Sequence, residues 1–226
     1  ARVTVNTIWH HLFGAGLVKS ADDFGIRSDT PSHPELLDWL AHQFMELGWS
    51  RKQFIRQIVL SATYQQSSRA RPDLSVSDPE NRWLARQNRM RVEAEIVRDT
   101  TLAVAGLLSS TVGGPSVFTP LPQDLIDTGY ANTFKWKTSD GEDRFRRGMY
   151  TFFKRSVPHP NLTSFDCPDS TTTVARRNRS NTPIQALTTL QNEVFHDAVQ
   201  AFSAKILNGN SDSDHERLTQ AFRDCV

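Results

Sequence analysis

Apolar side chains recur every three or four positions along several stretches of the chain, which is the period of an α-helix with one face in a core. The first stretch, residues 5–13, stops at Gly14, a residue type that tolerates the left-handed conformation after a helix. The second, residues 36–47, is preceded by Ser32 and Glu35 at the spacing of a capping box. These patterns predict two helices near the start of the chain.

Two further patterns predict helices in the middle of the chain. A second capping box at residues 50–53 opens a short apolar stretch with helical spacing. Asp78 before Pro79 combines a capping residue with a proline at the first helical position. It predicts helical structure over 79–108, either as one long helix or as two helices with a bend near Asn88.

The outer faces of the later helices follow from the same spacing. Glu95 and Arg98 stand three positions apart, so we expect them to pair on a solvent-facing surface.

Thr182 and Gln185 form another capping box, and the apolar residues after it predict a single helix that extends to about Leu207.

Regular periodicity disappears between residues 111 and 143, where glycines and prolines interrupt the chain. An ordered loop of that length is unusual and often functional. The stretch 146–157 is rich in aromatic residues and favours a short strand over a short helix. The expected fold is therefore mainly α: an irregular multi-helix domain with a long loop insertion at about 111–143 and at most a short β element. We expect one domain over residues 1–226, with two small domains as the alternative.

Composition and chain ends place limits on the context. The chain begins at Ala1 without Met, so we expect a fragment of a larger protein. The net charge of +1 argues against a general polyanion binder. Nucleic acid is not expected as a partner, because the arginines lack a row of aromatic residues or an even basic face. No run approaches the ~18 apolar residues of a membrane span. The basic excess gathers in residues 135–179, which hold ten Lys and Arg against five Asp and Glu.

The cysteines and short motifs predict no cofactor and no metal in this segment. Cys167 and Cys225 are too far apart for metal-ligand spacing. The chain also lacks the C-x-x-C-H motif that attaches a c-type haem. A disulfide between the two cysteines stays open at this point.

Three arginines, Arg176, Arg177 and Arg179, stand just before the Thr182 capping box. Guanidinium groups bind carboxylate, phosphate or sulfate in a fork, and a helix N-terminus adds free N–H groups, so this segment has the chemistry of an anion cradle. The alternative is a structural clamp, because buried arginines are normally paired. The expected acidic partners of such a clamp are Asp99, Asp166 and Asp169.

A wider site is expected if residues 176–179, the arginine segment, fold over the residues that precede them. Arg155, His159, Asp166 and Arg177 would then share one pocket. A secondary candidate combines Asp22 and Asp23 with His33, because two carboxylates and an imidazole suit a metal or acid–base site. The simpler reading places His33 at the first helical position, between its cap and a proline.

Seven ordered blocks carry a family resemblance: "WHHLFGAGLV", "DDFG", "PSHPELLDWLA", "FMELGWSRKQFIRQIVLSATYQQS", "RVEAEIVRD", "FDCPD" and "RRNRSNTPIQALTTLQN". Together, over about residues 1–195, they resemble the PSD1-type domain of unknown function of planctomycete-type proteins. The resemblance implies a domain that lies C-terminal to cytochrome c-like modules in an exported, multidomain protein of the cell envelope. Residues 170–173 replace a segment that often contains a cysteine in that family. No catalytic residues carry over from it.

Two functions follow as expectations. The first is a non-catalytic module that binds other domains of its parent protein, an anionic glycan or a small anion. The alternative is a hydrolase acting on an acidic or sulfated polysaccharide, with His159, Asp166 and the arginines around the reaction centre. An enzyme needs a pocket in which a histidine meets a carboxylate. A binding module needs an exposed surface.

Overall fold

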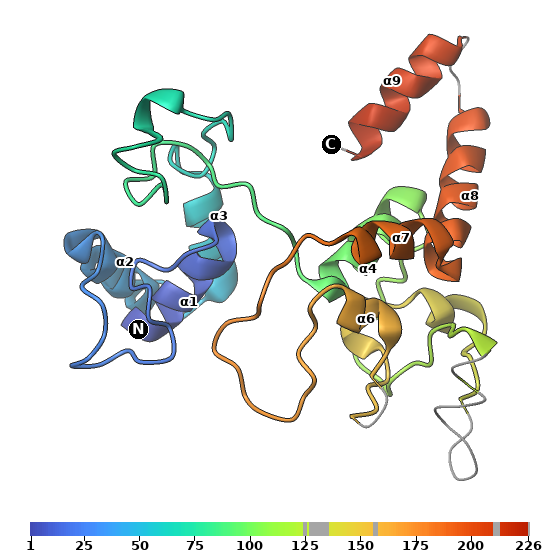
Figure 1. The fold of residues 1–226 in the computed structure, drawn as a ribbon, viewed down its shortest axis with the longest axis horizontal. Coiled ribbons are helices and arrows are strands. Elements are labelled where there is room, and N and C mark those ends of the chain that lie inside the picture. Colours follow the sequence, from blue (N-terminus) through green and yellow to red (C-terminus); the bar gives the residue numbers. More distant parts are fainter. Residues whose placement is uncertain (124–125, 127–135, 156–157, 210–212, 226) are drawn as a thin grey trace. The chain divides into compact units, whose positions relative to one another are not determined.

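The computed structural model describes residues 1–226 except 124–125, 127–135, 156–157, 210–212 and 226. The described part is mainly α-helical, and its β structure is limited to isolated bridges (Figure 1). The chain divides into two compact units. The first comprises residues 1–90 with 174–176, and the second comprises 91–173 with 177–226. Within the described residues, no helix is both long and apolar enough to cross a membrane.

The first unit is built from α1 (Arg2–Phe13), α2 (Pro34–Glu46) and α3 (Arg51–Val59), followed by a 3₁₀ turn, η1 (Pro72–Leu74). Gly14 ends α1 at φ +84°, as its position predicts. The two other helices pack through their apolar stripes, and the buried core consists of Val5, Trp9, Phe13, Leu17, Val18, Leu37, Leu40, Phe44, Phe54 and Ile58. The three helices predicted here are confirmed.

The helix caps of this unit differ in one detail from the expectation. Ser50 accepts a hydrogen bond from the backbone N–H of Gln53 at 3.4 Å, as the capping pattern predicts. The Ser32 box does not form, because the N-cap of α2 is His33 and Pro34 takes the first helical position. The Ser32 hydroxyl instead lies 3.0 Å from Nδ1 of His33.

The prediction of helical structure from Pro79 onward is wrong for the first half of that range. The carboxylate of Asp78 accepts hydrogen bonds from the backbone N–H groups of Arg82 and Trp83, at 2.7 and 2.9 Å. These bonds close a turn in place of a helix, and Asn81 and Leu84 adopt positive φ within it. A left-handed residue cannot continue a right-handed helix.

The second unit is built from α4 (Ala94–Ala105), α6 (Pro160–Ser164), α7 (Pro183–Gln191), α8 (Glu193–Leu207) and α9 (Asp214–Cys225). Two 3₁₀ turns, η2 (Gly141–Phe145) and η3 (Gly148–Tyr150), precede α6. α4 packs on α8, α6 and η3, while α7 packs on α6 and α8 (Figure 1). The buried core between these helices contains Ala94, Leu162, Phe165 and Phe195.

The long helix predicted from Thr182 to Leu207 is two helices. The predicted capping box of Thr182 and Gln185 is present and starts α7. At Asn192 the backbone turns to the extended region, with ψ 137°, and the Asn192 side chain accepts a hydrogen bond from the N–H of Val194. Asn192 is therefore the N-cap of a new helix, α8.

Part of the irregular segment 111–143 is held by one buried side chain. Arg146 is 3% exposed and donates to the backbone carbonyls of Thr111, Gly113 and Pro115. Its guanidinium also stacks over the ring of Tyr150, 3.9 Å from the centroid. Isolated bridges join Ser109 to Arg146 and Val117 to Thr151, so the predicted strand reduces to single contacts. Residues 124–125 and 127–135 of this segment lie outside the described residues.

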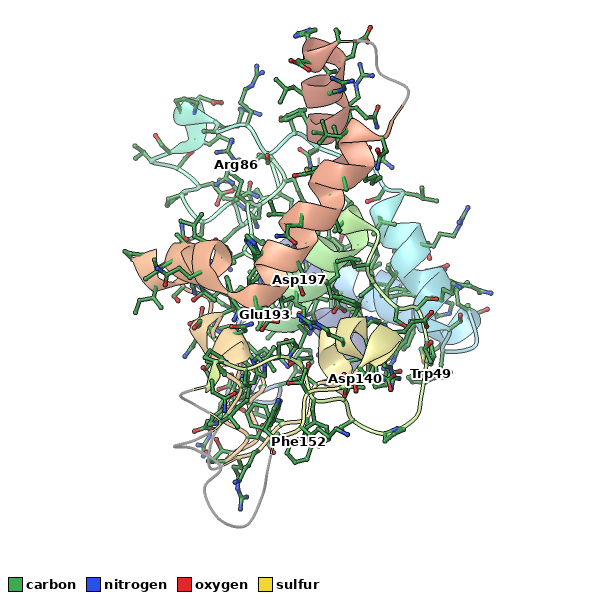
Figure 2. The ribbon with its side chains drawn as sticks, turned by 90° about the vertical axis from the view of Figure 1, so that its right-hand side faces the viewer. Trp49, Arg86, Asp140, Phe152, Glu193 and Asp197 are labelled. Carbon is green, nitrogen blue, oxygen red and sulfur yellow. The ribbon has the colours of Figure 1, made fainter. Side chains whose placement is uncertain are left out.

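η2 is tied to α8 by an ion-pair cluster. Arg144 donates to Glu193 at 2.6 Å and to Asp197 at 2.7 Å, two carboxylates one helical turn apart on α8 (Figure 2). Burial alone would lower the pKa of Arg144, but the hydrogen bonds and charges of the two carboxylates raise it. The cluster fixes the start of the segment that leads to η3.

Candidate functional site

The arginine segment between α6 and α7 is anchored by Arg177. Its guanidinium lies 2.6 Å from Glu95 Oε2 and 3.3 Å from Glu93 Oε2, and all three side chains are partly buried. Burial would lower the pKa of Arg177, but its hydrogen bond to Glu95 and the charges of both glutamates raise it. Arg177 therefore has the geometry of a structural clamp. Its carboxylate partners are these glutamates and not the aspartates that the sequence suggested.

The three aspartates proposed as clamp partners bind elsewhere. Asp99 accepts from Nε of Arg147 at 3.2 Å and from the N–H of Gly148 at 2.6 Å. Asp169 accepts from the backbone and hydroxyl of Thr171. Asp166, which adopts φ +63°, accepts from the N–H and hydroxyl of Ser180 at 2.7 and 2.8 Å.

A polar network then joins the arginine segment to α7. Gln185 is 2% exposed, and its amide lies 3.2 Å from the Ser180 hydroxyl and 3.4 Å from Asp166 Oδ2. Its carbonyl oxygen accepts from Arg91 and from the N–H of Thr182. Arg91 also lies over the ring of Phe165, 4.9 Å from its centroid. This buried network fixes where α7 begins.

The predicted arginines lie in different surroundings. Arg179 is half-buried and lines a narrow cleft with Asp166 and Arg177, and this cleft has no room for a water molecule. Arg176 is exposed and belongs to the first unit. Arg155 is exposed and does not line this cleft. The structure therefore brings together Asp166, Arg177 and Arg179 but does not bring Arg155 to them.

His159 lies in a separate cavity. It is 3% exposed, and its Nε2 lies 2.8 Å from the hydroxyl of Thr119. Burial, and then the charge of Arg98, lower the pKa of His159 to about 4, although the backbone carbonyl of Pro120 opposes them. The cavity wall contains no carboxylate among the described residues. The pocket expected to combine His159 with Asp166 and Arg177 does not form, because these residues line different cavities.

The secondary candidates lie in the first unit. Asp22 and Asp23 are exposed in the loop after α1, and His33 is the half-buried N-cap of α2. His33 is therefore not at the first helical position, which Pro34 occupies. A search of the described residues for three or more His, Cys, Asp or Glu side chains that could hold a metal ion finds none.

Both cysteines are free thiols. Cys167 is half-buried beside Glu95, with Sγ 3.8 Å from Oε1. Burial, and then the charge of Glu95, raise its pKa to about 11. A thiol with a raised pKa is a poor nucleophile, so the surroundings of Cys167 are those of a structural cysteine.

Sequence reasoning missed Arg98. It was expected on the surface beside Glu95, yet it is 7% exposed and faces the core of the second unit. The signal was available in the helical spacing, because Ala94 and Leu102 flank Arg98 at four-residue intervals and both are buried. A basic residue in line with two core positions is a candidate buried cation.

Comparison with known proteins identifies the family. No curated protein and no solved structure matches the chain. The family model that matches is PSD1, described as "Protein of unknown function (DUF1553)", and it covers residues 1–226. That match confirms the resemblance carried by the seven sequence blocks. The chain therefore belongs to the PSD1 (DUF1553) family.

Proposed function

We propose that the chain is a non-catalytic, partner-binding module that docks through the apolar face of α7. The observation that carries this proposal is the orientation of that helix. Ile184, Leu187 and Leu190 are 65%, 50% and 79% exposed, whereas Gln185 is 2% exposed. An amphipathic helix of a globular protein normally turns its apolar face to the core. In α7 the buried network around Gln185 holds the apolar face outward.

The neighbouring helices add exposed apolar side chains. Val199 and Leu207 on α8, and Leu218 and Phe222 on α9, are each at least 60% exposed. No residue of α9 is buried. Large exposed apolar surfaces on a soluble domain commonly mark interaction sites. The C-terminal helices as a group therefore support a docking role.

The chemistry of α7 favours a protein partner. The helix, PIQALTTLQ, contains no charged residue. A helix that lies on a membrane surface usually carries Lys and Arg on its polar face, which attract anionic lipids. The family resemblance implies a multidomain protein, so the partner we propose is a neighbouring domain of the same polypeptide.

The other expected functions receive less support from the geometry. An anionic glycan would have to compete with Glu93 and Glu95 for Arg177. A hydrolase centred on His159 and Asp166 would need both groups at one substrate, and they line different cavities. We therefore propose no second function.

The test compares Leu187→Asp with Thr189→Asp. Both changes place a carboxylate at an exposed position of α7, but Thr189 lies off the row formed by Ile184, Leu187 and Leu190. In the full parent protein, hydrogen exchange of α7 should be slower than in the chain of residues 1–226. Leu187→Asp should abolish that difference, and Thr189→Asp should preserve it. Equal exchange of α7 in both contexts would overturn the proposal.

A further inference from the structure

The second unit contains a buried arginine without an ion-pair partner among the described residues. Arg98 is 7% exposed, and its Nη2 donates to the backbone carbonyl of Arg144 at 2.7 Å. Its Nε has no hydrogen-bond partner in the part of the chain that the structure describes. The adjacent Asp99 is already bound to Arg147 and to the N–H of Gly148. Removing a charge from water without a paired counter-charge is costly, so we expect Arg98 to have a further partner.

Arg98 lines a small cavity with other polar groups. The cavity volume is about 10 Å³, which is room for the centre of roughly one water-sized particle. Thr151 and His159 also line it, and they are 8% and 3% exposed. Like Arg98 Nε, Thr151 Oγ1 is buried without a hydrogen-bond partner among the described residues. Two unsatisfied polar atoms on residues that line one cavity are unusual, because such groups are nearly always paired.

These atoms share a preference for a negatively charged ligand. Nε of Arg98 is a donor only, and the hydroxyl of Thr151 can rotate to donate. The rest of the wall is largely apolar and includes Leu162 and Phe165. Two donors and one buried positive charge, with no carboxylate among the described residues that line the cavity, match an anion better than a water molecule.

We propose that this cavity, between Arg98, Thr151 and His159, is a binding site for one small monovalent anion of halide size. The volume admits a single-atom anion and excludes sulfate or phosphate, which have five heavy atoms. Burial lowers the pKa of Arg98 to about 10, although the charge of Asp99 opposes this shift. The site differs from the arginine segment proposed from the sequence. It also does not depend on the docking role of α7.

The test uses bromide as the probe. Thermal unfolding of the chain is compared in sodium bromide and in sodium methanesulfonate at equal ionic strength. At ten times its dissociation constant, bromide should raise the ratio of folded to unfolded protein about elevenfold. For a chain of this size that corresponds to a rise in Tm of about 3–6 °C. Crystals grown in bromide should show an anomalous peak in the cavity.

Three variants separate the site from general salt effects. Thr151→Val removes one donor at nearly constant shape and should reduce the bromide shift by at least half. Arg98→Met should abolish it, and Arg155→Met, a change at an exposed arginine, should leave it intact. If Arg98→Met does not fold, the bromide shift of Thr151→Val and the anomalous peak decide whether the cavity binds an anion. The proposal fails if wild type melts equally in both salts, if Thr151→Val keeps the full shift, or if the cavity holds water without an anomalous peak.

Discussion

At the scale of single residues, the clamp made by Arg177 explains why a cluster of arginines can be structural. Of the three neighbouring arginines, Arg177 binds two carboxylates from the start of α4, whereas Arg176 is exposed. A hydrogen bond to a charged group that is partly buried is stronger than one on the surface. The two positions are therefore a matched pair for experiment.

Arg177→Met should destabilise the protein by about 1–2 kcal/mol, because Glu93 and Glu95 lose their ion pairs with Arg177 while still partly buried. The corresponding fall in Tm is about 2–8 °C. Arg176→Met is the control and should change stability by less than about 0.5 kcal/mol. Urea unfolding of the two variants and of an Arg177→Met, Glu95→Gln double mutant checks the pairing. Equal stability of the two single variants would show that the ion pairs contribute nothing measurable.

His159 should make stability depend on pH. Its pKa is about 4 in the folded state, against about 6.5 in an unfolded chain. Between these values the unfolded state binds more protons, so the contribution is present above about pH 6.5 and is lost as pH falls towards 4. The loss amounts to about 3 kcal/mol. His159→Gln keeps an acceptor for Thr119 but does not titrate, so its stability should fall less over this range in halide-free buffer. Parallel curves of unfolding free energy against pH for the two proteins would refute this prediction.

At the scale of elements, the close approach of η3 to α4 depends on a glycine. A Cβ on Gly148 would lie 2.9 Å from Cα of Glu95, which is backbone and cannot rotate away. Gly148→Ala should therefore separate the two elements and cost about 1–3 kcal/mol. Gly25→Ala is the control, because its nearest neighbouring atom is 4.0 Å away. Urea denaturation measures both. A Gly148→Ala protein as stable as the control would mean that α4 moves aside at no cost.

The elements that could be predicted are those decided by local spacing. α1, α2 and α3 follow from apolar periodicity and from glycine or serine at their ends. The Thr182 box also forms as predicted, because its two hydrogen bonds join residues three positions apart. The missing helix after Asp78 and the break at Asn192 depend on short polar side chains that can cap, turn or remain helical. Sequence spacing does not decide among these states.

The candidate site was less predictable because its contacts are distant in sequence. The arginine segment was recognised as a candidate clamp, but its glutamate partners precede Arg177 by more than 80 residues. The orientation of α7 depends on Arg91, which is 94 residues from Gln185. Propensity and capping rules do not reach that far. These rules predicted that Ile184, Leu187 and Leu190 lie on a helix, but they could not show that this apolar row faces outward.

At the scale of the whole molecule, each compact unit has a hydrophobic core of its own. The first unit buries a cluster that is supplied entirely by residues before Met90. A fragment of residues 1–90 should therefore retain helical circular dichroism and a cooperative thermal transition. The control is the same fragment with Phe54→Ala, which removes a fully buried ring and should abolish the transition. A fragment without cooperative melting would support the single domain that the sequence suggested.

The long reach of the clamp also has a consequence for biosynthesis. A ribosome adds about 5–20 residues per second, so roughly 4–16 s separate the synthesis of Glu95 from that of Arg177. At the end of that interval α4 and α6 have been synthesised, but α7 and α8 have not. In nascent chains that stop before Arg177, the surface of α4 that packs on α8 is therefore uncovered, and we expect such chains to depend on a chaperone.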